Sequence, residues 1–361
     1  ADKIQGIDYV YTIQGWLKGI NYPSLKTADD PGGDGANGFG KDAFGMVLGY
    51  HANDFNRSSS KYNPSTGELV SSQSGISNLY DGNISNWTLQ TDTIGANAAG
   101  HIGFMYRYDQ LNRIKTEDYR SYNGTSWSNP SNSYDNTYTY DANGNILTLN
   151  RKGNAQNMDD LSYNYTATTN RLDYVDDAVS SIYSTDIDDQ SANNYRYDAI
   201  GQLTKDVTQG IDTIGWTVYN RVSYIKKSNG DSISFLYNPN QQRVQKIVKP
   251  NGQPATVTYY STDAQGVPLS IYERTESGSN YVYKQKELPL YADARLGEYK
   301  PDLTIKTVNI SGCMSCGGPC GCTTCAINQW TINTAVQNGY YARPIGKKQY
   351  ELTDQLGNGR A

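Results

Sequence analysis

Apolar and polar residues alternate along much of the chain, most regularly in Tyr-x-Tyr pairs. These pairs occur at residues 9–11, 106–108, 138–140, 163–165, 195–197 and 281–283. Residues two apart lie on the same face of a strand, so each pair predicts two neighbouring rings on one face. Helical periodicity with capping signals is hard to find, and we therefore expect a nearly all-β chain.

Turn signals follow several pairs and lead into a second alternating run. In "YTYDANGNIL" (138–147), Asn143-Gly144 predicts a hairpin with a type I′ turn, in which both residues have positive φ. Asp141, at the strand exit, is expected to accept hydrogen bonds from backbone N–H groups of the turn. Variants return at 106–114 and 195–203, and the motif residues are Tyr108, Asp109, Tyr140, Asp141, Gly144, Tyr197, Asp198 and Gly201.

The aromatic composition favours a thin, wet wall of strands. The chain has 32 Tyr against 5 Phe and 5 Trp, so most large side chains carry a hydroxyl that needs water or a partner. With 35 Gly, turns are expected to be frequent. A thick apolar core is therefore not expected.

Charge and hydropathy exclude two classes of partner. The net charge is −5 with Lys and Arg scattered singly, which lacks the basic footprint of a nucleic-acid binder. No apolar run approaches the roughly 18 residues of a membrane span, and the N-terminus has no signal-peptide pattern. Both ends are expected to belong to a longer polypeptide.

Several segments resemble the Rhs/YD-repeat family in its Bacteroidota-type branch, a family of polymorphic-toxin shells. They occur in the family's order at 8–21, 42–50, 78–88, 287–301 and 346–361. The last is similar to the family's core signature Asp-x-Leu-Gly-Asn-x-Arg, carried here by Asp354, Leu356, Gly357, Asn358 and Arg360. Gln355 stands where His is usual and Gly359 where a β-branched residue is usual.

The resemblance implies an all-β fold, a YD-repeat β-spiral shell of long antiparallel strands and hairpins that forms part of a larger cocoon. It implies a β-shell at 1–302, a Cys-containing insertion at 303–344 and a truncated signature segment at 345–361. The expected function is to enclose and deliver a C-terminal effector beyond this chain, at the cell surface or after secretion. The expected partners are this cargo and export-machinery or outer-membrane proteins.

Two other functions stay open at this stage. One is a surface adhesin or glycan-binding protein that uses exposed aromatics such as Trp87 and Trp127. The other is cargo or a subunit of an outer-membrane export complex. Enzymatic activity within the chain is not expected: Gly-x-Ser-x-Gly is absent, and "GDGANG" (33–38) lacks the flanking strand and helix of a dinucleotide site.

The cysteines form one dense group, Cys313, Cys316, Cys320, Cys322 and Cys325. The two Cys-x-x-C pairs suit tetrahedral zinc or an iron–sulfur cluster, whereas an oxidising compartment favours disulfides. Redox catalysis is disfavoured, because Lys and Arg are absent from 307–342. We expect this group to stabilise an insertion that has no core of its own.

Acidic loops are candidate calcium sites, although none has EF-hand spacing. The groups are Asp29/Asp30/Asp34, Asp159/Asp160, Asp173/Asp176/Asp177 and Asp186/Asp188/Asp189. The Asp186 group is the strongest candidate by sequence, and solvated loops are the simpler interpretation of all four.

Overall fold

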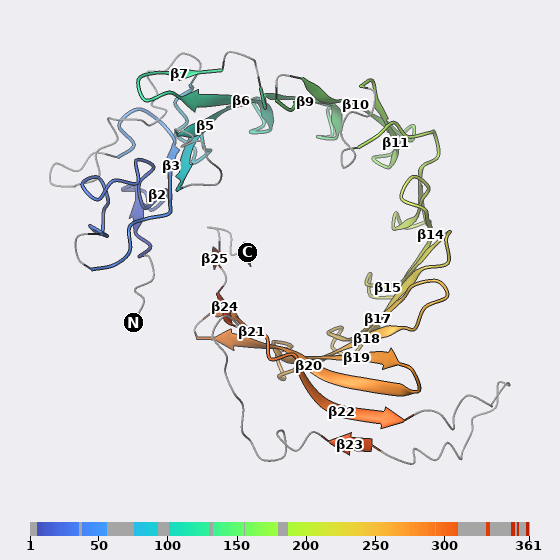
Figure 1. The fold of residues 1–361 in the computed structure, drawn as a ribbon. Coiled ribbons are helices and arrows are strands. Elements are labelled where there is room, and N and C mark those ends of the chain that lie inside the picture. The colour runs from blue at the N-terminus through green and yellow to red at the C-terminus, as the bar shows by residue number, and fades with distance from the viewer. Residues whose placement is uncertain are drawn as a thin grey trace. The chain divides into compact units, whose positions relative to one another are not determined.

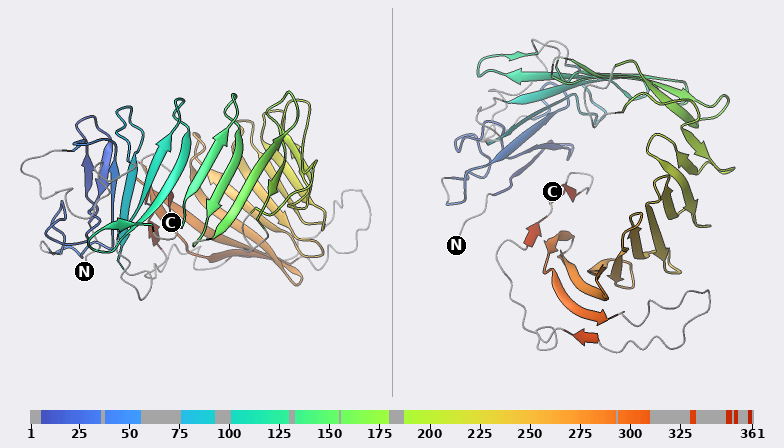
Figure 2. Two further views of the ribbon diagram at one scale, coloured as in Figure 1. Left: turned by 90° about the horizontal axis from the view of Figure 1, so that it is seen from above. Right: turned by 45° about the vertical axis from the view of Figure 1, so that its right-hand side comes forward.

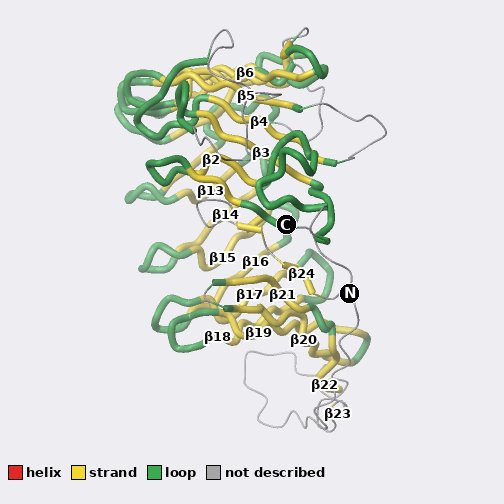
Figure 3. Tube along the Cα trace, turned by 90° about the vertical axis from the view of Figure 1, so that its left-hand side faces the viewer, coloured by secondary structure: helices red, strands yellow, loops and turns green. Residues whose placement is uncertain are grey.

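The computed structural model describes residues 6–35, 38–55, 76–92, 101–129, 133–154, 156–179, 187–292 and 294–309, and the backbone of four short strands beyond them (Figure 1). Regular structure in these residues consists of β-strands (Figure 3), and neighbouring strands pair antiparallel. The predicted all-β fold of antiparallel hairpins is confirmed. The described residues include no helix with the length and apolarity to cross a membrane.

The chain divides into two compact units, residues 1–192 and 193–361. The first holds an 11-stranded sheet in the order β1-β2-β3-β4-β5-β6-β8-β9-β10-β11, with β7 paired to β6 (Figure 2). Its strands are β1 (Tyr9–Tyr11), β2 (Leu17–Ile20), β3 (Phe44–Gly49), β4 (Asn86–Thr91), β5 (Ile102–Tyr108), β6 (Ile114–Tyr122), β7 (Trp127–Ser128), β8 (Asn136–Tyr140), β9 (Ile146–Lys152), β10 (Asn157–Tyr165) and β11 (Leu172–Asp177).

The second unit holds a 13-stranded sheet in the order β12 to β21 and then β24, with β22 paired to β20 and β23. Its strands are β12 (Tyr195–Tyr197), β13 (Leu203–Asp206), β14 (Ile211–Trp216), β15 (Val222–Lys227), β16 (Ser232–Tyr237), β17 (Arg243–Lys249), β18 (Thr256–Thr262), β19 (Pro268–Ser277), β20 (Asn280–Tyr291), β21 (Arg295–Tyr299), β22 (Leu303–Asn309), β23 (Trp330–Ile332) and β24 (Lys348–Tyr350). A separate pair is β25 (Leu352–Thr353) with β26 (Gly359–Arg360).

Strand β22 (Leu303–Asn309) lies in the segment that the sequence-based prediction assigns to the Cys-containing insertion. In the structure this strand pairs with β20 from Asn280↔Asn309 to Gln285↔Leu303. Residues 303–309 therefore belong to the sheet of the second unit, as do the short strands β23 and β24 further along the chain.

The burial pattern shows that the sheet of the second unit has no covering layer among the described residues. A sheet with one covered face alternates buried and exposed positions along each strand. In β20, residues 280–288 are instead all half-buried, and β16 and β17 are similar. Its fully buried apolar residues, Ile214, Val257, Tyr299 and Val308, lie on four different strands. Both faces are thus partly accessible.

Rings and cations pack on both faces of this sheet in place of a second layer. Tyr259 and Tyr260 are consecutive in β18, so they lie on opposite faces. Tyr259 stacks with Tyr283 at 6.5 Å between ring centroids, and the Arg243 guanidinium lies 5.7 Å from the Tyr260 ring. Such contacts stabilise half-exposed surfaces without a thick core.

A compact apolar cluster occurs near the start of the first unit, where Leu17, Leu48 and Tyr50 are buried together. Beside it, the Lys18 ammonium and the Asp54 carboxylate form an ion pair at 2.9 Å, with side-chain exposures of 5% and 7%. Asp54 also accepts a hydrogen bond from the Tyr50 backbone N–H. Burial, aided by the Asp54 charge, raises the pKa of Tyr50 to about 12.

We predict that Asp54→Ala strongly destabilises the first unit. The variant leaves the Lys18 ammonium buried without its counter-charge, a change that costs about 3–5 kcal/mol. Urea unfolding followed by Trp fluorescence measures it, since Trp16 lies 5.1 Å from the Tyr50 ring. Asp212→Ala is the matched control, because its pair with Lys205 is exposed to solvent and contributes little. Equal losses of stability in the two variants would contradict the prediction.

Candidate functional site

Seven of the described hairpin corners, at one edge of each sheet, share a single backbone pattern. The N–H of the first corner residue donates to the carbonyl of the fifth, and the N–H of the fourth donates to the carbonyl of the first. Because successive turns of an antiparallel meander alternate between edges, every second turn lies at the same edge. These corners are 12–16, 109–113, 141–145, 198–202, 217–221, 238–242 and 263–267.

The fourth corner residue has positive φ, for example Asn112 at 60°, Gly144 at 92° and Gly201 at 94°. Asn143 is not among the residues with positive φ, so the predicted type I′ turn at Asn143-Gly144 is wrong, although the hairpin is present. The register shifts between Thr139 and Tyr140, as in a three-residue loop with a bulge. This loop places one residue, not two, in the left-handed region.

The aspartate that opens a corner satisfies two backbone donors. Asp141 Oδ1 accepts hydrogen bonds from the N–H groups of Asn143 and Asn145, each at 2.8 Å. The same bonds occur at Asp109, Asp198 and Asp263. At 238–242 the amide oxygen of Asn238 accepts from the Gln242 N–H, so this acceptor does not need a charge.

The tyrosine that precedes a corner, or that precedes the turns at 166–171 and 292–294 on the same edges, bonds to the neighbouring hairpin. The Tyr140 hydroxyl donates to the Ile114 carbonyl at 2.7 Å, and Ile114 is the first residue after the preceding corner. The equivalent bonds are Tyr108 to Ile84, Tyr165 to Ile146, Tyr237 to Val222, Tyr291 to Pro268, and the Trp216 indole N–H to Leu203. We call these six bonds the corner ties.

Corner ties lie where the backbone ladder between hairpins has ended. Between β9 and β10, the pairing nearest this edge is Ser162↔Thr148, and the Tyr165 hydroxyl reaches Ile146 beyond it. Between β15 and β16, the pairing ends at Tyr224↔Ser234, before the tie from Tyr237. Neighbouring hairpins therefore diverge at this edge, and a side chain spans the gap.

Side chains also connect one corner to the next. Arg113 pairs with Asp109 at 2.6 Å, donates to the Asp141 carbonyl at 2.9 Å and lies 4.6 Å from the Tyr140 ring centroid. In the second unit, the Gln202 side chain donates to Asn220 Oδ1 at 2.7 Å. Corner 109–113 is thus bonded to corner 141–145, and corner 198–202 to corner 217–221.

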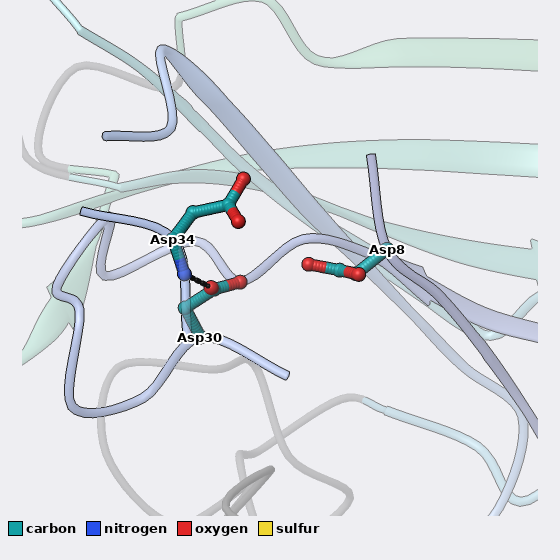
Figure 4. Close-up of side chains that lie close together, drawn as sticks. All are labelled: Asp8, Asp30 and Asp34. Carbon is teal, nitrogen blue, oxygen red and sulfur yellow. Dashed lines mark hydrogen bonds between the residues drawn. The ribbon is translucent and has the colours of Figure 1, made fainter. Parts of the chain in front are cut away.

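A carboxylate cluster lies apart from the corners, at the start of the first unit (Figure 4). One ligand oxygen from each of Asp8, Asp30 and Asp34 lies within 4.8 Å of the other two. Asp30 and Asp34 are 2% and 4% exposed. Burial and the negative charges of Asp30 and Asp34 raise the pKa of Asp8. Within the described part of the chain, no other three His, Cys, Asp or Glu side chains converge in this way.

The aspartates of the predicted acidic loops have different partners in the structure. Asp30 and Asp34 join the cluster, whereas Asp29 accepts a hydrogen bond from the Ser24 hydroxyl at 2.6 Å. Asp159 is buried and pairs with Arg151. Asp176 and Asp177 accept hydrogen bonds from Asn164 and from the Asp160 N–H, and Asp189 accepts one from the Asp177 N–H. Asp186 lies outside the described residues.

Two predicted groups fall outside the described residues. These are the cysteines, Cys313, Cys316, Cys320, Cys322 and Cys325, and the signature residues Asp354, Leu356, Gly357 and Asn358. Arg360 lies in β26, which is described for its backbone alone. The choice between zinc and disulfides stays a prediction.

The tryptophans considered for glycan binding pack against neighbouring rings. The Trp87 ring stacks with Phe104 at 5.7 Å, and Trp127 lies 5.2 Å from Tyr122 and 6.4 Å from His101. These contacts belong to the packing of β4 to β7.

Sequence reasoning missed Asp8 and the Trp216 tie. Asp8 precedes β1 as a single carboxylate, and the pairing of its backbone with Asn21 brings it near the loop at 30–34. Trp216 directly precedes corner 217–221, the position that a tyrosine occupies before other corners. This shared position relative to the corner could have identified Trp216 from the sequence.

No family model matches the chain, and no curated protein matches it by sequence. Among solved structures, a crystal structure of TcdB2-TccC3 without its hypervariable C-terminal region aligns over 98% of this chain at 12% identity, with a TM-score of 0.46. TcdB2-TccC3-Cdc42 aligns over 84% at 12% identity, with a TM-score of 0.43. The chain spans 14% of the length of each. The function is therefore inferred from the residues of this chain.

We predict that removing a corner tie weakens its sheet. Tyr165→Phe and Tyr237→Phe keep the ring and leave a backbone carbonyl without its donor, which costs about 1 kcal/mol each. Chemical unfolding of the two variants measures the change. Tyr224→Phe is the control: this ring is 44% exposed, and its hydroxyl has no hydrogen-bond partner among the described residues. A loss in Tyr224→Phe as large as in Tyr237→Phe would count against the tie.

We predict that two corners weaken in acid. Hydrogen bonds from Arg113 lower the pKa of Asp109, and those from Asn145 lower the pKa of Asp141, from the ordinary value of 3.8. A lowered folded-state pKa means that the ionised carboxylate stabilises the corner above the ordinary value and that this contribution is lost as pH falls through the folded pKa. Carboxyl chemical shifts and amide exchange at Asn145, followed downward from about pH 5, measure both.

Asp141→Asn should keep this hairpin and remove its pH dependence, as the neutral Asn238 corner suggests. Asp141→Ala should accelerate amide exchange at Asn145 at every pH, because both backbone donors lose their acceptor. Identical exchange in the Asn and Ala variants would show that the side-chain acceptor has no part in the corner.

Proposed function

We propose that the chain is a wall segment of a shell that encloses a C-terminal effector and delivers it. The observation that carries the proposal is the combination of uniform half-burial in the second sheet with corner ties along both sheets. A sheet that buries one face against a second layer forms a closed core and leaves no inner surface for cargo. A single-layer wall with two accessible faces can line a cavity.

The chemistry of the faces suits an enclosed polypeptide. Tyrosine, threonine and charged side chains dominate β18 to β20, and a surface of this kind offers a guest few purely apolar contacts. A cargo segment would thus be held without being bound tightly. The wall would act by enclosure, and we assign no catalytic residue to it. Delivery requires export, so a secreted or cell-surface location belongs to the same proposal.

The sealing of strand edges supports the same role. An open sheet exposes backbone donors and acceptors that pair with other chains. Here neighbouring hairpins share backbone ladders, and the corner ties continue the bonding where the ladders stop. A wall built in this way can be long without presenting free edges between its hairpins.

We predict that the wall protects the polypeptide C-terminal to it from proteases. In the natural polypeptide that contains residues 1–361, limited proteolysis should cleave the sequence after residue 361 much more slowly than it cleaves the same sequence expressed alone. Fragments identified by mass spectrometry give both rates. Equal rates, or the absence of any sequence after residue 361, would overturn enclosure.

The double variant Tyr165→Phe/Tyr237→Phe should lose part of this protection, whereas Tyr224→Phe should keep it. Glycan-array binding that disappears in Trp127→Ala, together with no protection, would favour the adhesin alternative.

A further inference from the structure

We propose that Asp8, Asp30 and Asp34 form a calcium site that fixes the N-terminal entry of the first sheet to the loop at 30–34. The three carboxylates come from two separate parts of the chain, and Figure 4 shows the Asp8 carboxylate directed towards Asp30 and Asp34. The site is independent of the proposed enclosure of a cargo.

The local fold holds each carboxylate in place. Asp8 is positioned by reciprocal bonds with Asn21: its N–H donates to Asn21 Oδ1, and its carbonyl accepts the Asn21 N–H, both at 2.8 Å. Asp34 Oδ2 accepts the Gly6 N–H at 2.8 Å, and Asp30 Oδ2 accepts the Asp34 N–H. These bonds orient the carboxylates but supply no cation.

Two buried carboxylate oxygens of the cluster have no hydrogen-bond partner among the described residues. The Asp30 oxygen that does not accept the Asp34 N–H points towards Asp8 in Figure 4. Asp30 is 2% exposed, its Oδ1 atom is buried without a hydrogen-bond partner, and the same holds for Asp8 Oδ2. An unsatisfied buried carboxylate oxygen costs a substantial desolvation free energy, more than a neutral group does. A cation among the three carboxylates would supply the missing partner for both atoms.

Two glycines allow this convergence. A Cβ on Gly32 would lie 2.1 Å from Asp8 Oδ2, and a Cβ on Gly6 would lie 2.3 Å from Asp34 Oδ2. Any side chain at either position would push a carboxylate away from its place. The backbone is therefore shaped around the three acids.

The donor set identifies the class of ion. Carboxylate oxygens are preferred by hard cations, and Ca²⁺ accepts them at about 2.3–2.6 Å in flexible geometry completed by water. Oxygens within 4.8 Å of one another fit around one such ion, and Asp8 is only half-buried, which leaves room for water ligands. Mg²⁺ needs a tighter octahedron at about 2.0–2.1 Å.

The test is calorimetric titration of CaCl₂ into the EDTA-treated full chain, with thermal unfolding in the presence and absence of Ca²⁺. We expect one site, a higher Tm with Ca²⁺, and weaker binding of Mg²⁺. Asp30→Asn should weaken Ca²⁺ binding more than about tenfold, because losing even an outer-shell partner of a metal site typically costs about 10–100-fold in affinity. Asp29→Asn is the matched control, since it removes an adjacent charge that is bonded to Ser24, and it should bind as the wild type does.

No Ca²⁺ binding at millimolar concentration, tighter binding of Mg²⁺, or equal weakening in Asp29→Asn and Asp30→Asn would overturn the proposal. If circular dichroism shows that Asp30→Asn is unfolded, Asp8→Asn replaces it, because Asp8 is the least buried of the three. A wild-type Tm that does not change with Ca²⁺ would also overturn the proposal, without any variant.

Discussion

The hydrogen bond from a tyrosine hydroxyl to a carbonyl of the neighbouring hairpin is the contact on which the arrangement of hairpins in each sheet depends. Within a hairpin, the backbone ladder continues to the corner, as Tyr140↔Ile146 shows. Between hairpins it stops earlier, at Thr116↔Thr137, and leaves carbonyls near the corner without ladder partners. Water can satisfy an exposed carbonyl, but it does not hold two hairpins together. The hydroxyl does both. Phenylalanine could not make the bond, which gives a physical reason for tyrosine at these five positions.

The two residues of the Tyr-Asp repeat have separate tasks. The aspartate acts within its own hairpin by accepting two backbone N–H groups, whereas the tyrosine acts between hairpins. Their tolerance for replacement differs accordingly. Asn238 and Thr217 replace the acid, because an uncharged oxygen also accepts a backbone N–H. Trp216 replaces a tyrosine, because an indole N–H also donates to a carbonyl at long reach. What persists at each position is the hydrogen-bonding role, so copies of the repeat that diverge in sequence can still share one geometry.

The hairpins were predictable from sequence because turn chemistry and alternation are local. Asp141 and Gly144 lie within one corner, and their roles follow from residue type. The turn type was not predictable, because Asn-Gly suits both a type I′ turn and a bulged loop, and the strand register decides between them. The carboxylate cluster was half predictable: Asp30 and Asp34 share a loop, whereas Asp8 joins them through the pairing of β1 with β2. Asp29 looked equivalent to Asp30 in sequence, and a single contact with Ser24 separates them.

The first sheet begins differently from the hairpins that follow it, and this difference follows from its packing. Residues 17–50 contain six of the nine buried apolar residues described in the first unit, and the buried pair of Lys18 and Asp54 lies beside them. A buried ion pair contributes little net stability but penalises arrangements that separate the two charges. The three acids near β1 impose a similar condition, since close approach of the carboxylates requires a compensating cation or a proton on one of them. The corner ties repeat along the wall and do not distinguish one hairpin from the next. The charged side chains near the first strands have specific partners, such as Asp54 for Lys18. This specificity can fix the register of the first strands, and the repeated hairpins continue from these strands.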